Sequence, residues 1–294
     1  MNDTSRNVSF TDPWIYCLDH GYVTPMICQS TEVLCFLLGT PALVWCLWIS
    51  LSGSISGGLK PTQIFPMNLC IVELLFCIEG LFQTIYYLFL PNNNMFLQVV
   101  YCLFFIAWVC RPLFQTCICV ERYMAVVQPV AFIKYRLRRY RMGTSTLIWG
   151  LAIIYPCFTV SSLGYLTKTN DVLVSVYCLG GVVISFCCFF ILRALKQPGP
   201  GEVEGGRGGE KKQRTTDPQK MRAFSIVLTN LVIILVSSIL VAVGFFTMPN
   251  SGIDFYCNTF LMLLACNMLS VVVSPVLHLH REGRLHCRKG PVTN

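Results

Sequence analysis

Charged side chains are scarce in this chain. Only 12% of its 294 residues are Asp, Glu, Lys or Arg, whereas 54% are hydrophobic. A soluble domain carries roughly 25% charged residues, so this chain has too little polar surface to enclose a water-soluble core. The scarcity excludes an ordinary soluble protein and indicates that much of the surface faces lipid.

Long apolar runs account for most of the remaining sequence. A helix needs about 20 apolar residues to cross the hydrocarbon core of a bilayer. Seven stretches are long enough, and they cover residues 31–52, 63–90, 96–120, 144–166, 172–195, 222–248 and 256–279. The sequence therefore predicts an all-α membrane protein, a bundle of seven transmembrane helices.

Of the 22 lysines and arginines, 19 lie at 134–141, 193–222 and 281–289 or at Lys60 and Arg122. Only Arg6, Arg111 and Lys168 lie elsewhere. Basic loops stay on the cytosolic side of a membrane. We therefore expect an extracellular tail at 1–30, a transmembrane domain at 31–279 and a cytosolic tail at 280–294. The net charge of +8 then reflects topology and contact with anionic lipid, and gives no reason to expect a nucleic-acid partner.

Two segments outside the apolar runs have a distinctive composition. Residues 197–219 are rich in Gly and Pro, which predicts a flexible third cytosolic loop. Residues 280–294 are basic and weakly amphipathic, which predicts a short helix lying on the membrane surface. The first 30 residues lack the pattern of a cleavable signal peptide, so the first apolar run is expected to act as the signal anchor.

Three positions in the tails are candidate modification sites. Asn2 and Asn7 each begin an Asn-x-Ser/Thr triplet, the acceptor pattern for glycosylation. Cys287, next to Arg288 and Lys289, is either a palmitoylation site or a free cytosolic thiol. Most of the 17 cysteines lie inside the apolar runs, where cysteine acts as a small apolar filler, so no metal site or cofactor is expected.

Ionisable residues at membrane depth are costly and usually functional. Glu73 lies eleven residues after Thr62, and Arg111 lies eleven residues before Arg122, so a rise of ~1.5 Å per residue places them at the same depth above the cytosolic face. We expect a buried ion pair between them. Two alternatives remain: Arg111 pairs with Glu79 instead, or it bonds backbone carbonyls of another helix.

The outer half of the third run carries three large aromatic residues, Phe104, Phe105 and Trp108. With Glu79 they are candidates for a ligand pocket, because the outer half of a helical bundle is where a small cavity forms. The alternative is that these aromatic residues only pack the core.

Several motifs resemble those of rhodopsin-like (class A) G-protein-coupled receptors, over essentially the whole chain. They are Asn68-Leu69 with Glu73-Leu74, Glu121-Arg122-Tyr123, Ala125–Pro129, Trp149, and Ser274-Pro275-Val276-Leu277-His278. Gly39-Thr40-Pro41 and Trp48 resemble the first helix of the purinergic, lipid and protease-activated branch.

The resemblance implies a function. In this family the arginine of the Glu121-Arg122-Tyr123 triplet is held by its acidic neighbour at rest and contacts a heterotrimeric G protein once the helices rearrange. It also implies an intramembrane polar core made of Asn68, Glu73, Arg111, Ser274 and Pro275. The chain departs from the family in ways that affect this core: Arg111 falls where a small residue helps to bind sodium, so no sodium dependence is expected.

Other departures concern the sixth helix and the outer disulfide. The prolines usual in the fifth and sixth helices are missing, which puts the ordinary activation movement in question. The family's disulfide between the third helix and the second outer loop also has no cysteines to form it. Cys17 and Cys257 are an alternative pair, with Cys28 and Cys102 as competitors.

The resemblance leaves the ligand open among lipid, nucleotide and peptide, and disfavours amines because Phe104 falls where amine receptors place an aspartate. Two alternatives to a signalling receptor remain: a non-signalling membrane scaffold with a receptor fold, and a transporter. The sequence contains no Ser/His/Asp set and no phosphate-binding loop that would predict an enzyme. The leading interpretation is a plasma-membrane receptor that transmits an extracellular signal to a G protein.

Overall fold

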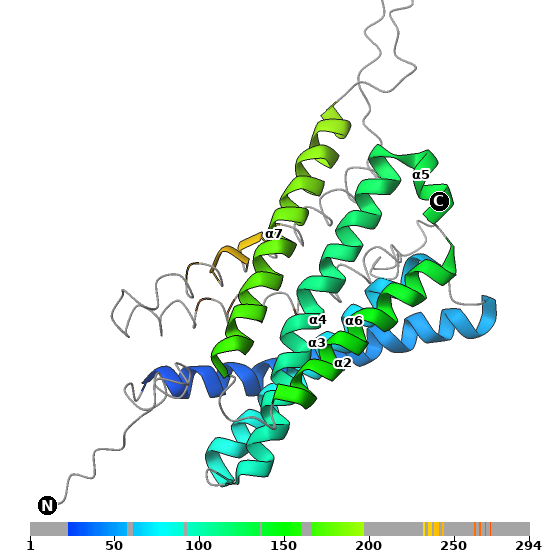
Figure 1. Ribbon diagram of the computed structural model, residues 1–294. Coiled ribbons are helices and arrows are strands. Elements are labelled where there is room, and N and C mark those ends of the chain that lie inside the picture. Colours follow the sequence, from blue (N-terminus) through cyan, green and yellow to red (C-terminus); the bar gives the residue numbers. More distant parts are fainter. Residues whose placement is uncertain are drawn as a thin grey trace, which may run out of the picture.

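The computed structural model describes residues 23–57, 61–90, 93–135, 137–159 and 166–196, and scattered helical positions between 232 and 271. Within these residues the chain is helical and contains no strand. Figure 1 shows the helices as long rods, with α4 and α7 running side by side.

Six α-helices and one 3-10 turn make up the continuous part of the structure. They are α2 (Val23–Gly57), η1 (Pro61–Gln63), α3 (Ile64–Phe89), α4 (Asn94–Val127), α5 (Pro129–Tyr135), α6 (Arg138–Thr159) and α7 (Leu166–Lys196). The first five predicted apolar runs thus correspond to α2, α3, α4, α6 and α7. The sixth and seventh runs lie largely outside the described residues.

Several helices extend beyond the apolar runs that predicted them. α2 begins at Val23, before the predicted boundary at residue 31, and α4 continues to Val127 rather than 120. The prediction of a basic loop at 134–141 was wrong for most of its length, because α5 ends at Tyr135 and α6 begins at Arg138. Hydropathy detects the part of a helix that lies in lipid, whereas backbone hydrogen bonding continues into the polar region beyond it.

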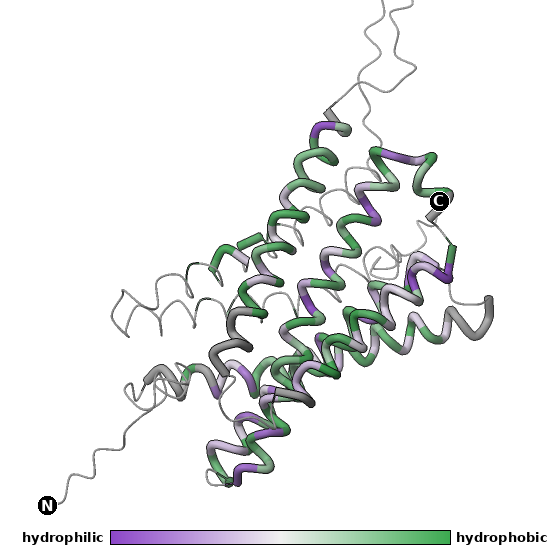
Figure 2. The backbone as a smooth tube through the Cα atoms, viewed as in Figure 1, coloured by the Kyte–Doolittle hydropathy of each residue, from purple (hydrophilic) through white to green (hydrophobic). Residues whose placement is uncertain are grey.

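Four of the described helices are long and apolar enough to cross a membrane: Gln29–Ser52, Pro61–Phe89, Asn94–Val127 and Val172–Ala194. Large apolar side chains on α2 point away from the other helices, including Leu37, Leu38 and Trp48. Figure 2 shows hydrophobic residues along most of each helix and hydrophilic residues gathered toward the ends. This is the surface of a multi-pass membrane protein, since lipid solvates apolar side chains that water would not.

The core is centred on α4, which packs against α3, α6 and α7, while α2 packs against α3. Its fully buried members include Leu43 on α2, Val72 on α3 and Phe114 on α4. Small residues allow close helix contact, as is usual in membranes. At Gly39 an added Cβ would lie 2.7 Å from Val271 Cγ1, so only glycine fits at this crossing.

Candidate functional site

The centre of the bundle contains the predicted ion pair. Arg111 on α4 donates from Nε to Glu73 Oε1 at 3.0 Å, and its Nη2 bonds the second carboxylate oxygen, Oε2. The guanidinium also lies over the ring of Phe76, 4.3 Å from the ring centroid. Both charged side chains are almost completely buried, so the two-pronged bond and the aromatic face replace the water that each charge has lost.

A second polar contact ties α3 to α6. Trp149 Nε1 donates to Asn68 Oδ1 at 2.8 Å, and Asn68 Nδ2 donates to the Ile64 carbonyl at 2.8 Å. Asn68 Nδ2 also lies 3.5 Å from Ser145 Oγ. The amide therefore uses both its acceptor and its donor, and fixes the position of α6 beside α3.

The charged triplet lies near the C-terminal end of α4, where α5 follows and α6 packs alongside. Glu121 accepts a bond from Arg141 Nη2 of α6 at 3.1 Å, and both side chains are buried. The guanidinium carbon of Arg141 lies 5.9 Å from the centroid of Phe132 on α5. The motif predicted that Glu121 holds Arg122, whereas the pairing of the same carboxylate with Arg141 was not predicted.

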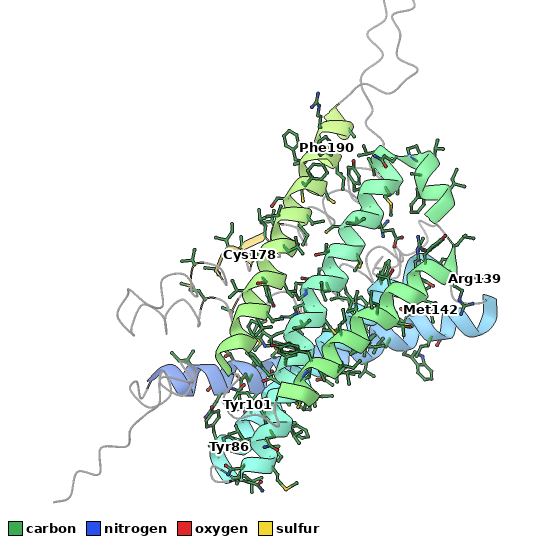
Figure 3. All side chains as sticks on the ribbon, viewed as in Figure 1. Tyr86, Tyr101, Arg139, Met142, Cys178 and Phe190 are labelled. Carbon is green, nitrogen blue, oxygen red and sulfur yellow. The ribbon has the colours of Figure 1, made fainter. Side chains whose placement is uncertain are left out.

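Tyr123, the third member of the triplet, faces α7. Its ring packs against Phe186 and Phe190, with centroids 6.1 and 6.2 Å away. Figure 3 shows Phe190 toward one end of the bundle, and Tyr86 and Tyr101 at the opposite end. The triplet thus contacts both α6 and α7. A movement of α6 would change the contacts of Glu121, and a movement of α7 would change those of Tyr123.

A small cavity lies between α2, α3 and α4, on the side of the ion pair away from the triplet. It is named here the Glu32–Glu79 cavity. Its lining consists of Glu32, Cys35, Phe76, Cys77, Glu79, Gly80, Gln83, Phe104, Trp108 and Met268. The free space is about 20 Å³, enough for about one water-sized group.

Three of the four predicted pocket residues line this cavity: Glu79, Phe104 and Trp108. Phe105 is not among the lining residues, because it turns toward α6 and stacks on Tyr155 with centroids 4.8 Å apart. Adjacent residues of a helix point about 100° apart, whereas residues four apart share a face. Glu32 is the member that the sequence analysis did not assign to the pocket.

Other predicted sites lie outside the described residues. They are the acceptors Asn2 and Asn7, the cysteines Cys17, Cys257 and Cys287, and Ser274 and Pro275 of the polar core. Of the predicted polar core, the structure describes Asn68, Glu73 and Arg111. Asn68 contacts α6 through Trp149, whereas Glu73 and Arg111 contact each other.

Comparison with known proteins identifies the kind of bundle. A family model described as 7 transmembrane receptor (rhodopsin family) matches residues 47–172. Proteinase-activated receptor 3 of Homo sapiens is 29% identical over 161 residues, which cover 51% of this chain and 42% of that protein. Purinoceptor 8 of Gallus gallus is 34% identical over 120 residues, covering 36% of this chain and 33% of that protein.

A longer but more distant match covers most of the chain. Proteinase-activated receptor 2 of Bos taurus is 22% identical over 307 residues, which cover 91% of this chain and 74% of that protein. In the two matches of higher identity, by contrast, the chain spans less than half of the relative's length.

The helical bundle, its apolar surface and its buried ion pair define a multi-pass membrane protein of the seven-helix class. Over residues 47–172 the chain is similar to the rhodopsin family of seven-transmembrane receptors, and the proteins that it resembles include protease-activated, purinergic and platelet-activating factor receptors. These relatives are receptors rather than enzymes.

Proposed function

We propose that this chain is a G-protein-coupled receptor of the plasma membrane. A ligand on the extracellular side shifts the bundle between two packings, and Arg122 presents its guanidinium to a heterotrimeric G protein in one of them. A seven-helix membrane protein needs a device at its cytosolic end to signal, and the triplet at the end of α4 is positioned to be that device.

The observation that carries this proposal is the setting of the triplet. Glu121 is buried and bonded to Arg141 of α6, while Tyr123 packs against two phenylalanines of α7. The similarity of residues 47–172 to the rhodopsin family supports the same role for Arg122. Burying charged residues is costly, so a purely structural role does not explain this cluster.

The remaining features of the proposed receptor follow from its orientation. The N-terminal tail is extracellular, with glycans on Asn2 and Asn7 and a disulfide between Cys17 and Cys257. The C-terminal tail is cytosolic, lies along the membrane and carries a lipid on Cys287. The Glu32–Glu79 cavity then belongs to the extracellular half of the bundle, where a ligand can enter.

Basal G-protein activation in cells tests the function. The wild type is compared with Arg122→Ala, with each signal normalised to the amount of receptor at the cell surface. The proposal predicts a basal signal above that of cells without receptor, and its loss in Arg122→Ala. Arg6→Ala, in the predicted extracellular tail, is the matched control and keeps the wild-type signal.

The same experiment addresses the main alternative, a receptor-fold scaffold that does not signal. A chain that reaches the cell surface but gives no basal signal with any of the four Gα classes, in wild type or variant, contradicts the proposal. An Arg122→Ala variant that signals like the wild type also contradicts it, because the guanidinium would then have no part in coupling.

A further inference from the structure

The Glu32–Glu79 cavity combines features that point to a particular ligand chemistry. Glu32 on α2 and Glu79 on α3 are both buried and both line the same small space. The two helices can approach here because residue 80 is glycine. A Cβ at Gly80 would lie 3.2 Å from Glu32 Cβ, tighter than ordinary packing. The backbone therefore holds two carboxyl groups together in the interior.

Acidic groups outnumber basic ones at this depth. Glu32, Glu73 and Glu79 are buried in the described transmembrane helices, and Arg111 is already bonded to Glu73 through both carboxylate oxygens. The other arginines of these four spans, Arg122 and Arg193, lie near helix ends. The sequence has no Lys or Arg between Arg222 and Arg281. Thr84 Oγ1 also donates to Glu32 Oε2 at 3.4 Å, so these side chains have contacts within the protein. Two acidic side chains at one depth still favour a positive ligand group over a phosphate.

The third feature is an independent one, a buried donor. Trp108 lines the cavity and is buried, and its Nε1–H has no hydrogen-bond acceptor among the residues that the structure describes. An indole N–H is a donor only, so its partner must be an acceptor atom. The rings of Phe76 and Phe104 lie beside Trp108, with centroids 6.1 and 5.0 Å away. Aromatic faces of this kind attract cations.

We propose that the Glu32–Glu79 cavity is a binding subsite for a protonated amine whose nitrogen is separated from an oxygen acceptor by two carbon atoms. The ammonium group lies between the two carboxyl groups and against the aromatic faces, and the oxygen accepts from Trp108 Nε1–H. The free space of about 20 Å³ is enough for the ammonium group, so the oxygen that accepts from Trp108 lies at the edge of the cavity. The rest of the ligand therefore lies outside this cavity.

This proposal rests on the proposed function in treating the bound molecule as the receptor's ligand. It differs from the expectation that amines are disfavoured, because that expectation considered only the position of Phe104 on α4. The structure places the acidic groups on α2 and α3 instead, across the cavity from Phe104.

Direct binding of four small probes to the full-length receptor in lipid nanodiscs tests the proposal without any G protein. The probes have four heavy atoms each: ethanolamine, propylamine, ethylene glycol and 1-propanol. Saturation-transfer NMR measures their affinities in the millimolar range expected for so few atoms. Ethanolamine is expected to bind best, propylamine more weakly, and the two neutral probes not measurably. Glycinamide carries the same ammonium–oxygen pair on a peptide unit, so its affinity relative to ethanolamine indicates which of the two ligand types the subsite suits.

Three variants locate the binding. Glu32→Gln and Glu79→Gln are each expected to weaken ethanolamine about tenfold or more, because each removes one charge-assisted contact. Trp108→Phe is expected to weaken ethanolamine about three- to tenfold and to leave propylamine unchanged. Glu204→Gln, in the predicted third cytosolic loop, is the matched control and binds like the wild type.

Other outcomes overturn the proposal. Absence of amine binding to the folded wild type does so, as does binding that the two glutamine variants leave intact. If sodium binds in the cavity and the amine probes do not, the cavity is a site for an inorganic cation, and the proposal is wrong. If the glutamine variants do not fold, the test is the ratio of ethanolamine affinity to propylamine affinity, compared between Trp108→Phe and the wild type. A ratio equal to the wild type's contradicts the assigned oxygen contact. Because no signalling is measured, these results stand apart from those of the Arg122→Ala experiment.

Discussion

Arg111 on α4 donates hydrogen bonds from two nitrogens to Glu73 on α3, one to each carboxylate oxygen, and both side chains are buried in the centre of the bundle. The resemblance stated in the sequence analysis implied an acidic residue and a sodium ion at this depth. Here the protein's own guanidinium supplies the positive charge. The ion pair also links two helices directly, so its effects on stability and on ion dependence can be measured separately.

The first prediction concerns the energy of this pair. Glu73→Gln and Arg111→Met should each lower the thermal unfolding midpoint and the surface expression, because each leaves one buried charge without its partner, at a cost of about 3–5 kcal/mol. The double variant should recover much of the loss, since neither charge remains. Losses that simply add in the double variant would mean that the two side chains do not stabilise each other.

The second prediction concerns sodium. With Arg111 present, the unfolding midpoint of the purified receptor should be the same in sodium chloride and in choline chloride of equal ionic strength. Arg111→Ser opens the space beside Glu73 and should introduce a sodium-dependent rise in the midpoint. A clear sodium effect on the wild type would be inconsistent with a guanidinium that takes the ion's place.

The third prediction concerns the link between α3 and α6. Trp149→Phe keeps an aromatic ring but removes the N–H that donates to Asn68 Oδ1 at 2.8 Å. We expect a loss of about 1–3 kcal/mol in the free energy of unfolding, because a part-buried amide oxygen loses its donor. Trp48→Phe is the control, since Trp48 is 69% exposed on the lipid-facing side of α2 and should unfold like the wild type. Equal effects of the two substitutions would argue against the bond.

The fourth prediction concerns helix packing at glycines. Gly39→Ala places a methyl group 2.7 Å from Val271 Cγ1, so it should lower the unfolding midpoint and the yield of folded receptor. Gly150→Ala is its counterpart, because a Cβ there meets nothing within 4 Å. It should be neutral or stabilise the helix by up to about 1 kcal/mol. A destabilised Gly150→Ala would show that the close approach at Gly39 is not the cause.

The fifth prediction concerns Arg141. Arg141 on α6 bonds the Glu121 carboxylate, and Arg122 follows Glu121 in the chain. Under the proposed function, Arg141→Gln leaves Glu121 more available to Arg122 and should lower basal G-protein activation. Glu121→Gln removes the acid from both and should raise it. Changes in the same direction for the two variants would contradict this competition.

Some parts of the site followed from the sequence because helices convert residue number into depth. Glu73 and Arg111 are the same number of residues from their cytosolic ends, and this count was enough to predict their contact. The family motifs likewise placed Asn68 and Trp149 on the helices where they meet, although the sequence analysis did not predict their hydrogen bond. Both cases depend on depth along a regular helix.

The direction in which a side chain points around its helix was harder to predict. Phe105 was grouped with Phe104 although adjacent helical residues diverge by about 100°, and a helical-wheel count would have separated them. The pairing of Glu121 with Arg141 depends on how α6 packs beside α4, which hydropathy does not record. Glu32 was visible as a buried acid in the first span, but its approach to Glu79 requires the crossing at Gly80.

The central claim is that the bundle crosses the membrane an odd number of times, with the end that carries Arg122 in the cytosol. Epitope tags at the two ends of the chain test this directly by antibody staining of cells. We predict that the N-terminal tag stains in intact cells and that the C-terminal tag stains only after the membrane is made permeable. Staining of both tags on the same side, or of the C-terminal tag alone in intact cells, would contradict the account.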